Sequence, residues 1–380
     1  MRKILFVRTV PYDFNANTYN VQGFGLGKAF CRLGYDFDFL CFSSKEEKEY
    51  VLCEESGHKV TVIVKKRLRL FRTGINLSIC NKEFLSQYEF VISCEYGQFM
   101  TYALSKASDN VVMYSGPYYN LFMLPFMSPI YDAIFTKAMN KNLQCKFVKS
   151  ELAKEYLEKK GYADLVNIGV ALDIERFDED VAIQPETQKL MQFMKSNRCI
   201  LYVGALSDRK NYPFTLEVYK KVLADNPDVK LVLIGKGDQA YIDKYMGQLS
   251  KVERAGVYRL ERIDNAQLKY IYPLAKAFLL PSKLEIFGMV LLESMYLGAP
   301  VVTSWNGGSS TLIDGRNTGI IVKKFDVDQW KKAVQEYLDD ENLSKRTTAA
   351  ARELIAKEFT WDVLAKKILG TTKGENNGEC

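Results

Sequence analysis

The stretch 281–302, PSKLEIFGMVLLESMYLGAPVV, is the most informative part of this chain. The apolar run AKAFLLPS that leads into it is typical of a short buried strand, and LGAPVV at its end is typical of a helix end followed by a second buried strand. Between them Glu285 lies in a loop, Gly288 precedes an apolar helix, and Glu293 falls inside that helix. This order of strand, loop, helix and strand predicts one unit of a parallel α/β sheet.

The predicted start of this helix is suited to an anion. The backbone amides of Gly288, Met289 and Val290 point toward one spot, where a helix N-terminus favours negative charge such as a phosphate. Glu285 and Glu293 add two carboxylates that can accept hydrogen bonds from neutral hydroxyl groups. A nucleotide sugar carries a diphosphate between hydroxyl-rich rings, so it is the ligand that these features predict.

Spacing alone would leave the two glutamates as ordinary solvated or capping carboxylates. Their surroundings argue otherwise, because 281–302 resembles the E-x7-E region of the GT4 family, retaining glycosyltransferases with the GT-B fold. The resemblance continues over 200–211 (ILYVGALSDRKN), 231–237 (LVLIGKG) and 306–319. It covers nearly all of the C-terminal half of the chain and is loose in the N-terminal half.

The resemblance implies a role for each of these residues. Glu285 and Lys210 would be catalytic: Glu285 offsets positive charge at the anomeric carbon of the donor sugar, and Lys210 stabilises the departing diphosphate. Glu293 would accept hydrogen bonds from the ribose hydroxyls. The remaining donor-binding residues are expected in the loops around the diphosphate: Arg209, Phe287, Gly288, Met289, Val290, Gly23 and Gly204.

One cation that the family usually has is missing here. An arginine usually follows the strand glycine, but Ala205 follows Gly204 in this chain. Lys210 is therefore the main side-chain cation expected at the diphosphate, with Arg209 as the alternative.

The first domain also departs from the family pattern, because the loop that often carries a histidine has none. The corresponding loop is 93–98 (SCEYGQ), and Glu95 or Tyr96 is expected to take the vacant place on the acceptor side. The chain has one histidine, His58, which argues against a metal site made of several histidines and against a Ser-His-Asp triad.

No metal or cofactor is expected. Asp36 and Asp38 form a D-x-D triplet of the kind that binds Mn²⁺ in glycosyltransferases of the other major fold, but here the triplet starts a predicted strand. Cations and a helix terminus would replace the metal at the diphosphate. The nucleotide diphosphate sugar enters as a substrate.

The length of 380 residues favours two domains. An N-terminal Rossmann-like domain that binds the acceptor is expected over 1–178, a linker over 179–196, and a donor-binding domain over 197–358. The resemblance adds a helix over 359–370 that crosses back onto the first domain, and the polar tail 371–380 is expected to be disordered.

The composition points to the cytoplasm. The eight cysteines form no C-x-x-C pair and lie in or beside apolar runs, as in a reduced protein. The N-terminal apolar run is too short for a signal peptide, and no stretch is long enough to span a bilayer.

Two segments of the first domain leave alternatives open. A basic run, interleaved with apolar residues, reads either as a solvated surface or as a site for anionic lipid: Lys65, Lys66, Arg67, Arg69 and Arg72. A nucleic-acid site is the weaker option, because the run is single and short. The aromatic, methionine-rich segment 116–129 reads either as an apolar loop under the domain or as the lip of a site for a lipid or sugar acceptor.

Together these features predict a GT-B enzyme with two Rossmann-like domains whose parallel sheets face a central cleft. It would move a sugar, with retention and without a metal, from a nucleotide diphosphate sugar to a saccharide or lipid-linked acceptor. The expected setting is synthesis of cell-surface polysaccharide or glycolipid, in the cytoplasm or peripherally at the inner face of the membrane. The alternative is a non-catalytic nucleotide-sugar-binding subunit of a polysaccharide assembly complex, which Ala205 and the missing histidine favour and the glutamate pair opposes.

Overall fold

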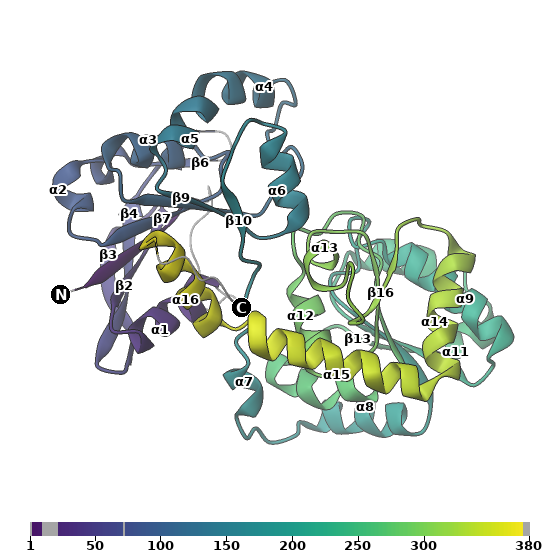
Figure 1. Cartoon of the computed structure of the whole chain (residues 1–380). Helices are drawn as coiled ribbons and strands as arrows, with labels where there is room; N and C mark the ends of the chain where they lie inside the picture. The colour runs from purple at the N-terminus through teal and green to yellow at the C-terminus, as the bar shows by residue number, and fades with distance from the viewer. Residues whose placement is uncertain (1, 10–21, 71–72, 375–380) are drawn as a thin grey trace. The chain divides into compact units, whose positions relative to one another are not determined.

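The chain folds into two compact α/β units (Figure 1). The computed structural model describes residues 2–9, 22–70 and 73–374. The first unit comprises Met1–Ala171 and Trp361–Cys380, and the second comprises Leu172–Thr360. The sequence predicts the first boundary after residue 178, whereas the units divide after Ala171.

The first unit is built on an eight-stranded sheet with the strand order β10-β9-β8-β7-β1-β2-β4-β3. Its pairs are parallel except that β3 runs antiparallel to β4. A two-stranded ribbon, β5-β6, is separate. The elements are β1 Lys3–Arg8, α1 Gln22–Arg32, β2 Asp36–Ser43, β3 Lys48–Glu55, β4 His58–Lys66, β5 Leu68–Leu70, β6 Thr73–Ile75, η1 Leu77–Ile79, α2 Lys82–Leu85, β7 Phe90–Cys94, α3 Phe99–Ala107, β8 Val111–Ser115, α4 Met127–Tyr131, η2 Asp132–Thr136, α5 Lys137–Asn142, β9 Cys145–Val148, α6 Glu151–Glu158, β10 Leu165–Asn167 and α16 Trp361–Thr372.

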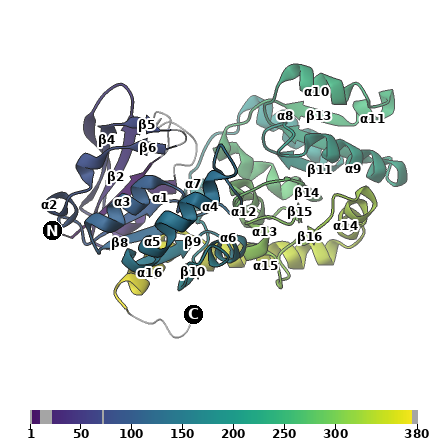
Figure 2. The same ribbon diagram turned by 90° about the horizontal axis from the view of Figure 1, so that it is seen from above.

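Helices cover both faces of this sheet, so its strands are apolar on both sides (Figure 2). One face packs on α1 and α16, and Phe30 stacks on Phe37 there. The other face packs on α3, α5 and α6 through a core that includes Leu5, Met100 and Met139.

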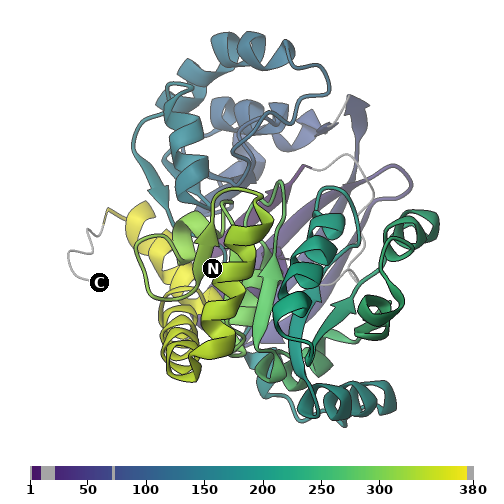
Figure 3. The ribbon, with the colours of Figure 1, turned by 90° about the vertical axis from the view of Figure 1, so that its right-hand side faces the viewer.

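The second unit is built on a six-stranded parallel sheet with the strand order β13-β12-β11-β14-β15-β16. Its helices lie on both sides of the strands (Figure 3). The elements are α7 Glu175–Asp178, α8 Pro185–Lys195, β11 Arg198–Val203, α9 Tyr212–Asp225, β12 Val229–Ile234, α10 Gln239–Met246, α11 Lys251–Ala255, β13 Val257–Leu260, η3 Asn265–Tyr270, η4 Tyr272–Leu274, β14 Ala277–Leu280, α12 Met289–Tyr296, β15 Val301–Ser304, α13 Ser309–Leu312, β16 Ile320–Val322, α14 Val327–Asp339 and α15 Glu341–Glu358.

Two segments differ from their sequence-based description. Most of the expected linker 179–196 forms α8, which begins at Pro185 and buries Leu190 and Met194. The edge strand β3 is not predicted, because its sequence KEYVLCEE is half charged and largely exposed. The described part of the basic run extends from the end of β4 into the strand β5.

The last helix, α16, belongs to the first unit and packs on α1. Arg32 of α1 holds Asp362 of α16 through an ion pair of 2.8 Å. α16 continues to Thr372, and the rest of the predicted tail from residue 375 onward lies outside the described residues.

Candidate functional site

The loop 281–288 connects β14 to α12 at the carboxyl edge of the second sheet, where ligands bind in open parallel sheets. Gly288 caps the helix with a φ of 89°, a left-handed conformation that glycine adopts without steric cost. The first amides of α12, those of Met289 and Val290, lie in the first helical turn after this cap, at the end of the loop. The amino end of α12 is therefore suited to an anion.

Lys210 and Glu285 meet at this edge. The Lys210 ammonium donates to Oε2 of Glu285, and Arg209 approaches the same oxygen at 3.6 Å. The side chains of Lys210 and Glu285 are only 11% and 13% exposed, so water screens this pair weakly. The sequence assigns the two residues to separate roles, and the structure brings them into direct contact.

Two backbone contacts hold the loops of these residues together. The amide of Lys283 donates to the carbonyl of Arg209 at 2.9 Å, and the Arg209 guanidinium donates to the carbonyl of Leu284 at 2.8 Å. The loops follow β11 and β14, which are adjacent and parallel. Their carboxyl ends therefore lie at the same edge, which explains why residues 75 positions apart in the sequence meet.

A third loop lies against the same place. The amide of Gly307 donates to the carbonyl of Glu285 at 3.1 Å. A Cβ atom added to Gly308 would lie 1.9 Å from the carbonyl oxygen of Phe287, so only glycine fits there. The Phe287 ring is buried, which indicates that this residue anchors the loop in the core and offers a ligand only its backbone.

Gly204 and Ala205 follow β11 at this edge. The amide of Gly204 donates to the carbonyl of Ile234 at 2.9 Å, which ties its loop to the turn after β12. Ala205 is exposed, so a longer side chain would have room. Its carbonyl accepts a hydrogen bond of 2.8 Å from the Tyr202 hydroxyl, and burial, with the nearby charge of Glu285, raises the pKa of Tyr202.

Glu293 is a deeply buried member of the predicted site. It lies in the second turn of α12 and is 1% exposed. Helical side chains lean toward the helix N-terminus, so its carboxylate is directed back along α12 toward the first turn. Its contact with a ribose stays a prediction.

In the first unit, Glu95 lies at the carboxyl edge of the sheet, just after β7. Its φ of 68° is uncommon for a residue with a side chain. The carboxylate accepts hydrogen bonds from Lys149 at 3.1 Å, from the amide of Gly116 at 2.9 Å and from Ser115 at 3.3 Å. Strained backbone held by several contacts is frequent at functional sites.

Lys149 is a residue that sequence reasoning missed. It follows β9 and lies over the ring of Tyr114, 4.7 Å from its centroid, while it bonds Glu95. The signal that could have identified it is its position directly after the apolar strand β9. Because β9 and β7 belong to the parallel part of one sheet, their carboxyl ends lie at the same edge.

Tyr96, the other acceptor-side prediction, lies in the core. It is buried among Tyr131, Tyr156 and Tyr162, and its hydroxyl lies 3.2 Å from that of Tyr156. Burial is the main cause that raises the pKa of Tyr96. Of the two side chains, that of Glu95 is the partly exposed one, and its role on the acceptor side stays a prediction.

Gly23 and Gly25 lie inside helix α1, whereas the sequence predicts Gly23 in a loop around the diphosphate. Close packing explains both glycines. A Cβ atom on Gly23 would lie 2.3 Å from the Phe39 ring, and one on Gly25 would lie 2.2 Å from Nε1 of Trp361. A donor-binding role for Gly23 stays a prediction.

Asp36 and Asp38 have structural partners. Asp36 accepts hydrogen bonds from the amide of Lys59 and contacts His58, while Asp38 is buried against Lys3 and Tyr88 at 2.7 Å each. Burial is the main cause that raises the pKa of Asp38. Among the described residues, no group of three or more metal-binding side chains comes together.

The residues of the basic run are not all described. Lys65 lies 3.7 Å from Glu47, and Lys66 and Arg69 are exposed. Arg72 lies outside the described residues. The anionic-lipid role of Lys65, Lys66, Arg67 and Arg69 stays a prediction.

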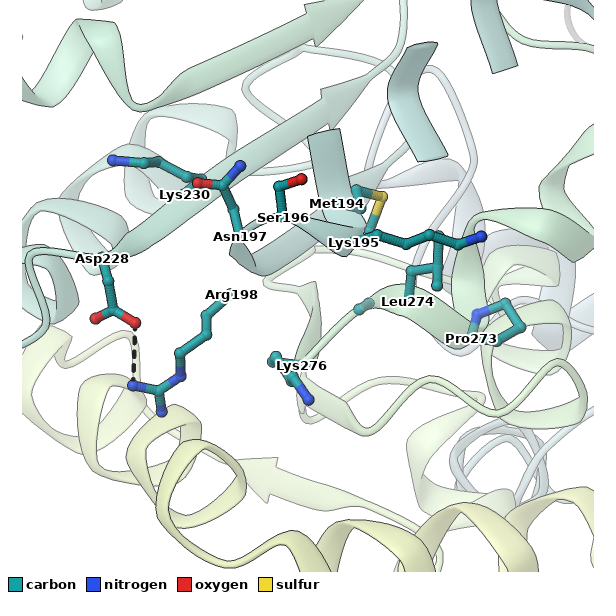
Figure 4. A pocket seen from close by; sticks show the side chains of 11 residues that line it. Met194, Lys195, Ser196, Asn197, Arg198, Asp228, Lys230, Pro273, Leu274 and Lys276 are labelled. Carbon is teal, nitrogen blue, oxygen red and sulfur yellow. Dashed lines mark hydrogen bonds and ion pairs between the residues drawn. The ribbon is translucent and has the colours of Figure 1, made fainter. Parts of the chain in front are cut away.

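The second unit also has an open pocket of about 630 Å³ (Figure 4). Its lining comes from the end of α8 and from the residues at the starts of β11, β12 and β14. Arg198 lies 3.5 Å from Asp228 there. The pocket is at the amino edge of the sheet, whereas Lys210 and Glu285 lie at the carboxyl edge, so it is separate from the candidate site.

No described helix combines the length and the apolar content that crossing a bilayer requires.

Known proteins resemble the C-terminal half of the chain in sequence. Residues 184–354 match the model of the family described as glycosyl transferases group 1. The O-antigen chain mannosyltransferase B of Escherichia coli is 34% identical over 165 residues, which are 43% of this chain and 42% of that protein. A glycogen synthase of Mycobacterium tuberculosis is 32% identical over 168 residues, 44% of this chain and 40% of that protein. The chain spans about half the length of the curated relatives it matches, between 40% and 55% for those compared.

Solved structures resemble the whole chain in fold. Sucrose-phosphate synthase from Thermosynechococcus elongatus is 18% identical, with a TM-score of 0.70 and complete coverage of both chains. HepE of Anabaena in complex with UDP-glucose is 16% identical, with a TM-score of 0.67 over 98% of this chain and 100% of the other. The solved structures therefore show that the chain has the GT-B fold, and its residues 184–354 are similar to the group 1 glycosyl transferases.

Proposed function

We propose that this protein transfers a sugar, with retention of anomeric configuration, from a nucleotide diphosphate sugar to a saccharide or lipid-linked acceptor. The contact of Lys210 and Arg209 with Glu285, at the amino end of α12, is the observation that supports this most. It places two cations, a helix terminus and a carboxylate together, which suits a diphosphate joined to a sugar. Relatives named as mannosyltransferases and as a glycogen synthase, and the group 1 family match, support the same class of activity.

The departing diphosphate is stabilised by Lys210, Arg209 and the first amides of α12. As the bond between the anomeric carbon and the phosphate oxygen breaks, negative charge grows on that oxygen. Fixed donors and cations lower the energy of this charge without reorganising. In this proposal they make a metal ion unnecessary.

Glu285 offsets the positive charge that develops at the anomeric carbon. In the unliganded chain its carboxylate neutralises Lys210, and a bound diphosphate would draw Lys210 toward itself and leave Glu285 closer to the sugar. Glu293 accepts hydrogen bonds from the ribose. The acceptor oxygen forms its new bond on the face that the diphosphate leaves, and its proton passes to a donor phosphate oxygen.

The acceptor is assigned to the carboxyl edge of the first sheet, beside Glu95 and Lys149. Both side chains are partly exposed there, at 27% and 11%, and both can bond hydroxyl groups. A phosphate on the acceptor would meet Lys149. The setting that this favours is synthesis of polysaccharide or glycolipid, in the cytoplasm or at its membrane.

The experiment is to incubate the purified chain with UDP-, GDP- and ADP-sugars and to measure release of nucleoside diphosphate with and without oligosaccharide or lipid-linked acceptors. Release that depends on the acceptor, and that is lost in Glu285→Gln, is expected. The anomeric proton of the product, observed by NMR, tests retention. Nucleotide-sugar binding without release under any acceptor would instead favour a non-catalytic binding subunit.

A further inference from the structure

Exposed apolar side chains of the first unit gather on the segment 121–134. Of the fourteen large apolar side chains that are exposed among the described residues, six lie in this segment. The exposed fractions are 60% for Met123, 62% for Phe126, 54% for Ile130 and 61% for Ile134, and Leu121 and Leu124 complete the set. A contiguous patch marks an interaction surface, whereas single exposed apolar residues are ordinary.

The inner side of the same segment is fastened to the core. The ring of Tyr131 lies 4.7 Å from that of Phe135 and 5.2 Å from that of Phe122, measured between centroids. The Tyr131 hydroxyl donates to the carbonyl of Tyr96 at 2.9 Å. The segment is thus apolar on both sides, but only its inner side is covered by the protein core. A helix that is apolar on all sides is normally buried on all sides.

The charges around the patch indicate which kind of partner it fits. The only acidic residue in 116–142 is Asp132, and its carboxylate is bound by Lys160 and Ser128. Lys137 and Lys141, at the C-terminal end of the same helical stretch, are exposed and form no ion pair with any described residue. Apolar side chains next to unneutralised cations match a bilayer that has anionic headgroups above an apolar interior.

We propose that 121–134 is a membrane-docking surface. Phe126, Ile130 and Ile134 insert below the headgroups of an anionic bilayer, and Lys137 and Lys141 contact the headgroups. Figure 1 shows α4, which carries part of this surface, at the outer edge of the first unit. The inference does not depend on sugar transfer, because it rests on residues that take no part in the proposed donor site.

The first test is binding to vesicles of phosphatidylcholine and phosphatidylglycerol in equal parts, measured by cosedimentation. The combined variant Phe126→Ser, Ile130→Ser and Ile134→Ser should bind roughly a hundredfold more weakly, since each half-exposed side chain would lose part of the burial free energy of an apolar residue. The matched control replaces three exposed apolar residues of the second unit: Ile183→Ser, Val252→Ser and Phe325→Ser. It should bind as the parent does.

The second test separates charge from insertion. Lys137→Gln with Lys141→Gln should weaken binding to the anionic vesicles roughly tenfold and leave binding to pure phosphatidylcholine vesicles unchanged. Phe126→Trp should show fluorescence quenching by lipids brominated on their acyl chains, and Phe325→Trp should not. If the triple serine variant fails to fold, the quenching measurement still tests the proposal.

Three results would overturn the proposal. The first is that the triple variant keeps the parent's vesicle affinity while a variant with Lys65, Lys66, Arg67 and Arg69 changed to Gln loses it, which would place docking on the basic run. The second is that bound Phe126→Trp protein shows no quenching. The third is that the parent sediments as a dimer that the triple variant converts to a monomer, with no vesicle binding by either, which would make the patch an interface between copies.

Discussion

The contact between Lys210 and Glu285 allows the diphosphate site to be tested by a double-mutant cycle on ligand binding. We expect Lys210→Ala to weaken binding of the preferred nucleoside diphosphate, which a thermal-shift screen of UDP, GDP and ADP would first identify. A hydrogen bond to a charged group contributes about 1.5–3 kcal/mol, so the loss should be roughly ten- to a hundredfold. Binding of the nucleoside without phosphates should change much less.

The structure predicts that this loss depends on Glu285. Without Lys210, the Glu285 carboxylate is largely buried, still has the Arg209 guanidinium at 3.6 Å, and opposes the charge of the diphosphate. Lys210→Ala should therefore cost more in the parent than in Glu285→Gln. Groups in direct contact usually couple by about 0.5–3 kcal/mol, and the low exposure of both side chains favours a value above the lower limit.

Calorimetric titration of the four proteins measures this coupling, and Lys283→Ala is the matched control. Lys283 lies in the same loop as Glu285, but its ammonium bonds Asp208 at 2.7 Å and is well exposed. Its removal should change the dissociation constant by less than about threefold, as for other exposed ion pairs. If Lys210→Ala matched Lys283→Ala, or weakened nucleoside and diphosphate equally, these loops would not hold the phosphates.

Further predictions concern neighbouring features. Gly288→Ala should lower the free energy of unfolding by about 1–2 kcal/mol, observed in denaturant titrations, because the native φ of 89° is costly for alanine; an unchanged midpoint would contradict this conformation. Ala205→Arg should tighten diphosphate binding, and weaker binding in the titration would show that the exposed position does not face the phosphates. EDTA should leave transferase turnover intact, whereas complete loss restored by Mn²⁺ would return attention to the D-x-D triplet. The Cys199 thiol is buried, and burial raises its pKa to about 12, so it should react with a thiol reagent only on unfolding; rapid labelling of the native chain would contradict its burial.

Much of the second unit could be predicted from local sequence. Short apolar runs identify β11 and β14, and Gly288 followed by apolar residues identifies the start of α12. These signals are local because strand burial, glycine turns and helix starts each depend on a few adjacent residues. The GT-B fold, expected from the resemblance, agrees with the solved structures of the same architecture. The charged edge strand β3 could not be predicted in this way, because none of its residues is buried and its sequence lacks the apolar pattern of a core strand.

Only the tertiary structure decided which side chains meet. Glu285 and Lys210 are 75 residues apart, and nothing local reveals their ion pair, which arises because β11 and β14 are neighbours in the sheet. In the same way, the sequence left Glu95 and Tyr96 as equal alternatives. Packing of aromatic rings buried Tyr96, while the chain turn left Glu95 at the sheet edge with Lys149. Local sequence therefore determined which elements form, and long-range packing determined which of their residues are available for chemistry.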